Sequence, residues 1–204
     1  MAEKIKRIAI MGGTFDPIHF GHLVTSEAVK EQFHIDKVLF IPSGQPPHKK
    51  DKIVSAAEQR YMMTLLATES NPSFFPSRIE IDREGYSYTI DTIRQLKKDE
   101  PEAEIYFITG ADAFLQILTW RNPEELLRSC HFVAATRPGY TCPQLTEEVN
   151  RLSNEYGAHI HFIEVPALSI SSSDIRQRVR EGKSIKYLLP ETVENYIYKH
   201  GVYK

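Results

Sequence analysis

The chain carries the sequence IAIMGGTFDPIHFGH at residues Ile8–His22. Its first part, Ile8–Met11, is a continuous apolar run that meets Gly12 and Gly13, which is typical of a buried parallel strand ending in a tight turn. From residue 22 to residue 33, apolar side chains recur in four-residue steps, as in an amphipathic helix. A strand, a glycine turn and a helix are therefore predicted in that order.

The same alternation of short apolar runs and helical periodicity continues along the chain. Further strands are predicted at 38–41, 78–82, 105–108, 132–135 and 160–165, and helices at 56–69, 89–98, 123–128, 145–156, 172–180 and 190–200. Strands separated by helices favour right-handed βαβ crossovers, so an α/β fold with a doubly wound parallel sheet is predicted for about residues 4–165. The remainder, about 166–204, is predicted to be a C-terminal helical addition. Because no linker separates the two parts, residues 1–204 are predicted to form a single domain.

Composition argues against several classes of protein. The 204 residues include 25 Lys and Arg against 27 Asp and Glu, a net charge of −2, which lacks the basic excess typical of nucleic-acid-binding proteins. No apolar run approaches the ~18 residues of a membrane span, and the start of the chain lacks a signal-peptide core. We therefore expect a cytoplasmic protein without nucleic-acid or membrane partners. Cys130 and Cys142 suggest neither a disulfide framework nor a zinc site.

Residues 12–22 place features suited to phosphate directly after the first predicted strand. Two glycines let the backbone approach a ligand closely, and the start of the following helix offers unpaired amides. His19 and His22 are three residues apart, so both imidazoles can lie on one face and donate hydrogen bonds to a polyphosphate. The alternative is a plain strand–turn–helix connection in which the histidines cap the helix or face solvent. The whole eleven-residue segment favours the phosphate site.

A second segment suited to an anion lies at Ile170–Arg176. Three serines, Ser171–Ser173, precede a predicted helix and offer hydroxyls and free amides. Arg176 adds a fork of donors that matches phosphate oxygens, and Arg180 follows one turn later. Taken alone, a serine-rich helix start is more often a simple cap.

Together these segments resemble a known family. The residues His19-Phe20-Gly21-His22 match the H-x-G-H core of the nucleotidyltransferase superfamily, and Ile170–Arg176 is similar to its C-terminal I-S-S-T/S-x-I-R motif. The longer first motif, with PPHK at 46–49 and SYTIDT at 87–92, resembles the bacterial nicotinate-nucleotide adenylyltransferase family. Members of that family transfer AMP from ATP to nicotinate mononucleotide, giving nicotinate adenine dinucleotide and pyrophosphate in NAD biosynthesis. The resemblance implies a Rossmann-like nucleotidyltransferase fold.

The resemblance also implies a role for each matching residue. The catalytic residues would be His19, His22 and Arg176, with the histidines stabilising phosphate charge and Arg176 holding the leaving pyrophosphate. The ATP-binding residues would be Gly12, Gly13, Thr14, Phe15, Gly110, Asp112, Ile170, Ser171 and Ser172. The residues that bind nicotinate mononucleotide would be Asp16, His48, Lys49, Thr89, Trp120 and Arg121. In that family the tryptophan stacks on the pyridine ring. No side chain is assigned to a metal, and Mg²⁺ would arrive with ATP.

Other functions stay open. Another adenylyltransferase on the same scaffold, such as the phosphopantetheine enzyme, would not be expected to carry the segments at 46–49 and 87–89. An enzyme for nicotinamide mononucleotide would differ in its recognition of the carboxylate. A non-catalytic nucleotide sensor would not need both histidines and Arg176, and an RNA-binding module would need more basic charge. The sequence leaves open whether the chain forms a homo-oligomer.

Overall fold

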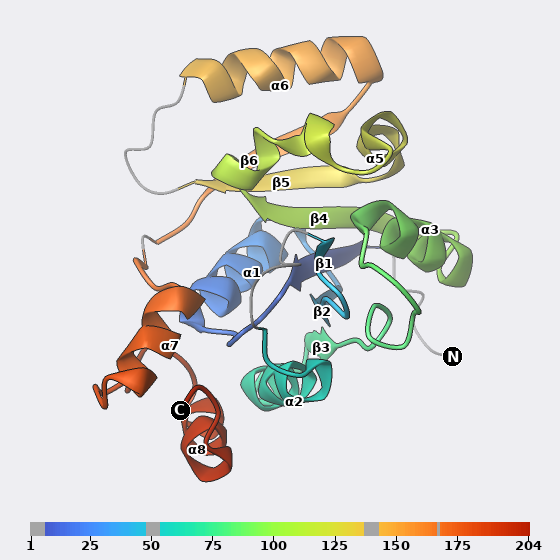
Figure 1. Cartoon of the computed structure of the whole chain (residues 1–204). Coiled ribbons are helices and arrows are strands. Elements are labelled where there is room, and N and C mark those ends of the chain that lie inside the picture. The colour runs from blue at the N-terminus through green and yellow to red at the C-terminus, as the bar shows by residue number, and fades with distance from the viewer. Residues whose placement is uncertain (1–6, 48–53, 137–142, 167) are drawn as a thin grey trace. The chain divides into compact units, whose positions relative to one another are not determined.

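The computed structural model describes residues 7–47, 54–136, 143–166 and 168–204, and its strands and helices alternate along the chain (Figure 1). The strands are β1 Arg7–Gly13, β2 Lys37–Pro42, β3 Phe74–Pro76, β4 Glu104–Gly110, β5 His131–Thr136 and β6 His159–Glu164. The α-helices are α1 Phe20–Phe33, α2 Ala57–Thr68, α3 Thr89–Asp99, α4 Ala111–Phe114, α5 Pro123–Ser129, α6 Pro143–Tyr156, α7 Ser172–Arg180 and α8 Glu191–His200. A short 3₁₀ helix, η2, spans Ile117–Thr119.

The described strands form one six-stranded sheet in the order β3-β2-β1-β4-β5-β6. The registers of β1 with β4, β4 with β5 and β5 with β6 are all parallel. The chain builds the sheet outward from β1 on one side and then returns to add β4 on the other. This order confirms the predicted α/β fold with a doubly wound parallel sheet. In such sheets ligands bind at the carboxyl ends of the strands where the order reverses, which here are the ends of β1 and β4.

The strands have apolar side chains on both faces because helices cover the sheet. In β1, Ile8, Ala9 and Ile10 are each at most 1% exposed, and in β2 Phe40 and Ile41 are fully buried. Continuous apolar runs of this kind are the pattern expected of parallel strands buried on both sides.

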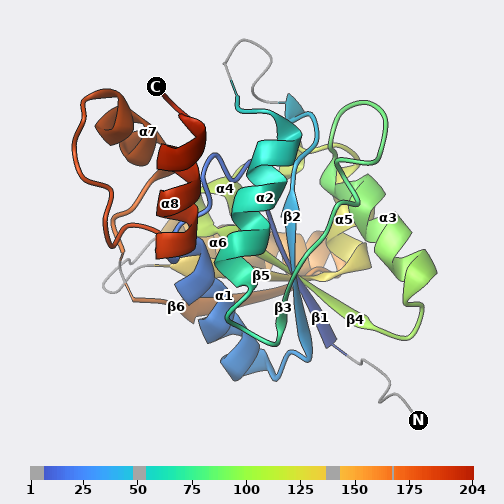
Figure 2. The same ribbon diagram turned by 90° about the horizontal axis from the view of Figure 1, so that it is seen from below.

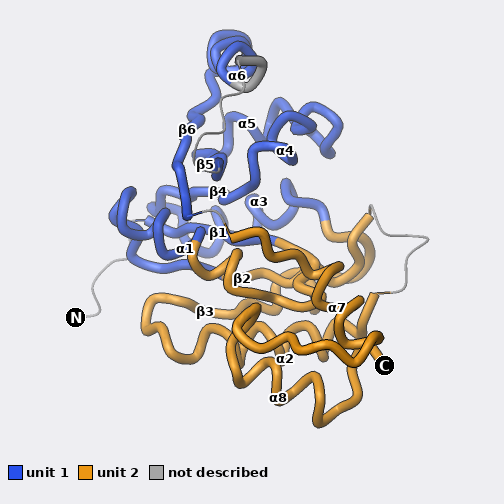
Figure 3. The backbone as a smooth tube through the Cα atoms, turned by 90° about the vertical axis from the view of Figure 1, so that its left-hand side faces the viewer, with its two compact units in different colours: residues 1–12, 25–39, 88–167 blue, residues 13–24, 40–87, 168–204 orange. Residues whose placement is uncertain are grey.

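The chain divides into two compact units, each made of segments that are distant in sequence (Figure 3). Unit 1 comprises residues 1–12, 25–39 and 88–167, and unit 2 comprises residues 13–24, 40–87 and 168–204. Within unit 1, α6 packs on β6 and α3 packs on α5 (Figure 1). Within unit 2, α2 and α8 lie side by side (Figure 2). The single-domain organisation predicted for the chain stays a prediction.

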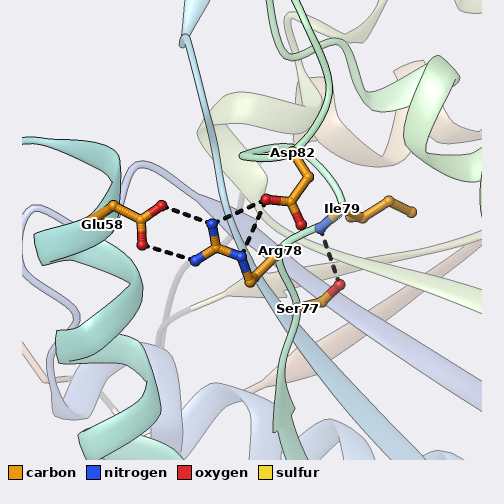
Figure 4. Close-up of polar contacts among 5 residues, drawn as sticks. All are labelled: Glu58, Ser77, Arg78, Ile79 and Asp82. Carbon is orange, nitrogen blue, oxygen red and sulfur yellow. Dashed lines mark hydrogen bonds and ion pairs between the residues drawn. The ribbon is translucent and has the colours of Figure 1, made fainter.

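The predicted strand at 78–82 is wrong. The backbone N–H groups of Ile81 and Asp82 both donate to the carbonyl of Arg78, at 2.8 and 2.9 Å, which closes a tight turn. The guanidinium of Arg78 donates to the carboxylates of Glu58 and Asp82, so the charges that alternate in this segment form ion pairs (Figure 4). The strand in this region is β3, whose three residues are too few to leave a periodic pattern.

Most predicted helices are confirmed to within about two residues, which is the usual uncertainty of helix ends. The helix α7 spans the predicted residues, and α1 begins at Phe20, two residues before the predicted start. The short helices α4 and η2 were not predicted, because single turns carry no periodicity to detect.

Candidate active site

His19, in the loop between β1 and α1, lies against His22 in the first turn of α1, and residues 16–22 are called the histidine loop below. Their ring centroids are 3.8 Å apart, and the backbone N–H of His19 donates to Nδ1 of His22 at 3.2 Å. This bond makes Nδ1 the acceptor, so the proton of the neutral His22 ring resides on Nε2, which is then a hydrogen-bond donor. At Gly21 a β-carbon would lie 3.0 Å from two atoms of the His19 ring, so only glycine leaves that ring its position.

Burial keeps both imidazoles neutral. Burial lowers the pKa of His19 from 6.5 to about 4. For His22, burial and then the nearby charge of His19 lower the pKa to about 3. Near pH 7 the pair therefore offers N–H donors rather than fixed positive charges. The Nδ1 atom of His19 is buried and has no hydrogen-bond partner within the described residues.

The backbone at the start of α1 is already partly hydrogen-bonded. The N–H of His19 is taken by His22, and the N–H of Phe20 donates to the carbonyl of Leu188 at 3.2 Å. These two amides are therefore not free for a ligand, although the sequence predicted unpaired amides at the start of this helix.

The structure brings the second predicted segment onto the first. The hydroxyl of Ser172 donates to the carbonyl of Pro17 at 2.8 Å, and the guanidinium of Arg176 donates to the carbonyl of Asp16 at 2.7 Å. Ser171 caps α7, since its Oγ accepts a hydrogen bond from the N–H of Asp174 at 3.1 Å. All these residues belong to unit 2. Ser171 therefore is a helix cap, as the simpler interpretation predicted, and the segment that it begins also lies beside the histidine loop.

Phe15 lines the histidine loop from inside. Its side chain is 2% exposed, and its ring meets the edge of the His22 ring at a centroid distance of 5.0 Å. Phe15 has a φ of 50°, an uncommon conformation for a residue with a side chain. Its neighbour Gly13 accepts hydrogen bonds from the N–H and hydroxyl of Ser43, at 2.9 and 3.1 Å, which hold the end of β1 to the residue after β2.

In unit 1, predicted ligand-binding residues gather around Phe107 of β4. A β-carbon at Gly12 would lie 3.6 Å from the Phe107 ring, and the ring of Trp120 meets Phe107 edge to face at 5.8 Å. Trp120 is half-buried, which leaves part of the indole open to a stacking partner. The guanidinium of Arg121 lies over the ring of Tyr88 at 4.5 Å, directly before the start of α3 at Thr89.

Two further predicted residues follow the end of β4. Gly110 is the last residue of β4, and Asp112 lies in the first turn of α4. Both are exposed. His48 and Lys49, predicted to bind the mononucleotide, lie outside the described residues.

Sequence analysis missed Arg60 and Tyr203. Arg60 is 1% exposed, and its guanidinium donates to the carbonyls of Thr14, Gly44 and Ser55. Tyr203 donates its hydroxyl proton to Oδ1 of Asp16 at 2.8 Å. Arg60 shares the buried side of α2 with residues 63, 64 and 67, a spacing typical of one helix face. The signal available in the sequence was a charged residue at a position that this spacing assigns to the buried face of α2.

The described residues contain neither a metal-binding cluster nor a membrane-spanning helix. No group of three or more His, Cys, Asp or Glu side chains among them could hold a metal ion. No helix in the described parts of the chain is both long and apolar enough to cross a membrane.

Nearly the whole chain aligns with curated relatives. A family model described as cytidylyltransferase-like matches residues 10–178. The chain is 60% identical to the probable nicotinate-nucleotide adenylyltransferase of Moorella thermoacetica over 199 residues, which cover 97% of this chain and 92% of the relative. It is 58% identical to the protein of that name from Thermoanaerobacter sp. over 203 residues, covering 99% and 96%. The chain belongs to the nicotinate-nucleotide adenylyltransferase family.

Solved structures share the fold of this family member. Two structures of the Plasmodium falciparum nicotinic acid mononucleotide adenylyltransferase, one complexed with NaAD and one with APC, match with TM-scores of 0.77 and 0.76. Each covers 97% of both chains, at 22% and 20% identity. At such identities the likeness concerns the fold. The family predicted from the motifs is confirmed by the relatives, and the Rossmann-like nucleotidyltransferase fold is confirmed by these structures.

Proposed function

We propose that this family member transfers AMP from ATP to nicotinate mononucleotide, producing nicotinate adenine dinucleotide and pyrophosphate. The observation that carries the proposal is the pair of neutral imidazoles, His19 and His22, held together at 3.8 Å. The segment with Ser172 and Arg176 is hydrogen-bonded to the same loop. Relatives named for this activity share 60% and 58% of the sequence, which supports the choice of substrates.

The proposed reaction is a direct in-line displacement. An oxygen of the 5′-phosphate of the mononucleotide attacks the α-phosphorus of ATP. The bond from that phosphorus to the oxygen bridging to the β-phosphate breaks, and pyrophosphate leaves with both electrons of the bond. The protein contributes positioning and charge stabilisation rather than a covalent intermediate.

The catalytic roles follow from the donors that the site offers. The Nε2–H of His22 would donate to an oxygen of the α-phosphate, and His19 would serve the neighbouring phosphate. Arg176 binds the Asp16 carbonyl through one N–H, and the guanidinium has five N–H donors in all. Those left over would hold the leaving pyrophosphate together with the backbone N–H of Ser172, the first residue of α7. Because each imidazole is neutral near pH 7, each offers one N–H group as a hydrogen-bond donor.

The remaining ATP contacts are proposed from residues of each unit. In unit 2, Gly13, Thr14, Phe15, Ile170 and Ser171 line or adjoin the histidine loop. In unit 1, Gly12 directly follows the buried part of β1, Gly110 is the last residue of β4, and Asp112 lies in the first turn of α4.

We also propose how the mononucleotide is recognised. The indole of Trp120 packs edge to face with the ring of Phe107, and we propose that it stacks on the pyridine ring of the mononucleotide. The start of α3 at Thr89 and the cation of Arg121 would attract the nicotinate carboxylate. Asp16, His48 and Lys49 complete the proposed set. A carboxylate site of this kind would favour the acid over the amide.

Magnesium fits this proposal as an ion brought by ATP. Mg²⁺ commonly binds through substrate phosphates, water and only one or two carboxylates. When bound, the ion would neutralise phosphate charge. We propose no protein side chain as its ligand. A cytoplasmic location remains a prediction, and whether the chain forms a homo-oligomer stays open.

The decisive experiment measures pyrophosphate release from ATP and Mg²⁺ with nicotinate mononucleotide, nicotinamide mononucleotide and phosphopantetheine in parallel. A strong preference for nicotinate mononucleotide is expected. Activity with only nicotinamide mononucleotide would refute the recognition of a carboxylate at Thr89, and activity with only phosphopantetheine would also refute the stacking of Trp120. Silence with all three, in folded protein that still binds ATP, would favour a nucleotide sensor.

A further inference from the structure

A buried arginine connects three loops of unit 2. The guanidinium of Arg60 donates from Nη1 to the carbonyl of Thr14 at 2.8 Å and from Nη2 to that of Gly44 at 3.1 Å. Its Nε donates to the carbonyl of Ser55 at 2.9 Å. These carbonyls lie outside the helices and strands, so a side chain must satisfy them or leave them unpaired. The planar fork of one arginine thus sets the spacing of three loop segments.

The charge of Arg60 is balanced within the same network. Burial lowers the pKa of the guanidinium, while the nearby carboxylate of Asp16 opposes that change. Asp16 is 3% exposed, and it accepts hydrogen bonds from the hydroxyl of Tyr203 at 2.8 Å and from the N–H of Ser55 at 3.4 Å. The loop that carries Thr14 and Asp16 is therefore held at two points.

The backbone of Gly44 is closely constrained by its neighbours. The N–H of Gly44 donates to Oγ of Ser87 at 2.9 Å. A β-carbon on Gly44 would lie 2.2 Å from the carbonyl oxygen of Glu80, so the turn at 78–82 presses directly on the Gly44 backbone. With Arg60 on its carbonyl, Gly44 is fixed by three separate groups.

The loop that Arg60 holds at Thr14 carries residues proposed for both substrates. Thr14 lies five residues before His19, which would contact the ATP phosphates. Asp16, two residues after Thr14, would contact the mononucleotide. In-line displacement depends on the distance and angle between the attacking oxygen and the α-phosphorus, and a shift of ~1 Å costs about 100-fold in rate.

We propose that Arg60 is a positioning residue for AMP transfer, which holds the loop that carries Asp16 and His19 at a fixed separation from Gly44 through the carbonyls of Thr14 and Gly44. Arg60 touches neither substrate in this proposal. It acts through the two backbone carbonyls, and its effect is therefore on turnover rather than on affinity. The proposal rests on the proposed function.

Arg60→Lys tests it, because lysine keeps the charge beside Asp16 but lacks the planar fork. We expect kcat to fall by about 10–100-fold, as for a small misplacement of reacting groups, while the KM values for ATP and nicotinate mononucleotide change by less than about threefold. Arg60→Gln, measured in the same way, should lose at least as much turnover. The matched control is Arg151→Lys on α6, which alters an exposed arginine that also makes three side-chain hydrogen bonds, and it should keep wild-type kinetics.

Thermal melting of each variant shows whether the protein is folded at the assay temperature. A folded Arg60→Lys protein with wild-type kcat would overturn the proposal, and so would a loss confined to KM. Failure of both Arg60 variants to fold would overturn it as well, because the arginine would then support the fold and not the reaction geometry. If the wild-type protein itself releases no pyrophosphate with nicotinate mononucleotide, the proposed function fails instead.

Discussion

Acid should destabilise this protein strongly, and the two stacked histidines should account for much of the effect. Burial lowers the pKa of His19 to about 4 and that of His22 to about 3, from 6.5 in an exposed chain. The folded pKa values lie below the unfolded ones, so the unfolded state takes up protons first. The stability contributed by the neutral pair is therefore complete above pH 6.5 and is lost progressively as the pH falls toward 4 and then 3.

The size of the effect follows from the pKa values. At pH 5 each imidazole is mostly protonated in the unfolded chain and still neutral in the folded one. The gap of about 1.5 pH units below 6.5 corresponds to ~2 kcal/mol for each histidine, at about 1.4 kcal/mol per unit. The two together amount to ~4 kcal/mol, a large part of the 5–15 kcal/mol that stabilises a typical domain.

Urea unfolding at pH 7.5 and at pH 5, followed by circular dichroism, measures this loss in the wild type and in His22→Gln. The loss between the two pH values should be ~2 kcal/mol smaller in the variant, because one titrating group is gone. The His131–His161 pair also has lowered pKa values, but it is present in both proteins and cancels in the difference. Ile18→Val, in the same loop, is the control. It should lower stability by about 1 kcal/mol equally at both pH values. Identical pH dependence in the wild type and His22→Gln would refute the reasoning.

Three further predictions concern the site. Replacing His22 by alanine should lower kcat by about 10²–10³, as loss of a charge-stabilising donor does elsewhere, and near-wild-type turnover in the folded variant would exclude its role. Trp120→Ala should raise the KM for nicotinate mononucleotide by up to about tenfold while leaving the KM for ATP unchanged, since a lost ring stack is worth ~0.5–1.5 kcal/mol; an equal rise for both substrates would count against stacking on the pyridine. Ser171→Ala removes the side-chain acceptor at the start of α7 and should cost ~1 kcal/mol in a thermal or urea unfolding experiment, and an unchanged stability would show that the cap contributes nothing.

Sequence patterns predicted those features that depend on regular periodicity. The long helices and the buried strands follow from apolar spacing, and the order of strands and helices was enough to predict the doubly wound sheet. The segment at 78–82 shows the limit of this reasoning. Its alternating charged and apolar residues have the pattern of a strand. The segment instead forms a turn, in which Arg78 makes ion pairs with the carboxylates of Glu58 and Asp82. No local pattern reports which charges will pair after folding.

The candidate site was predicted in part. Motif spacing brought out the histidines, the serines before α7 and Arg176, and the structure joins them through the carbonyls of Asp16 and Pro17. The neutrality of the histidines could not be predicted, because it depends on burial by residues distant in sequence. Arg60 was missed for a similar reason, since its partners are backbone carbonyls that no side-chain motif encodes.

The discontinuous make-up of unit 2 has a consequence for protein synthesis. The ribosome makes residues 13–24 early, but Ser172, Arg176 and Tyr203, which hydrogen-bond to that loop, come after all of unit 1. A nascent chain that ends before residue 168 therefore contains both histidines without the segment that braces them. The strands β4–β6 follow one another in sequence and end at Glu164, so all three are made before residue 168. Translation thus delivers the bracing of the histidine loop only in its last stage.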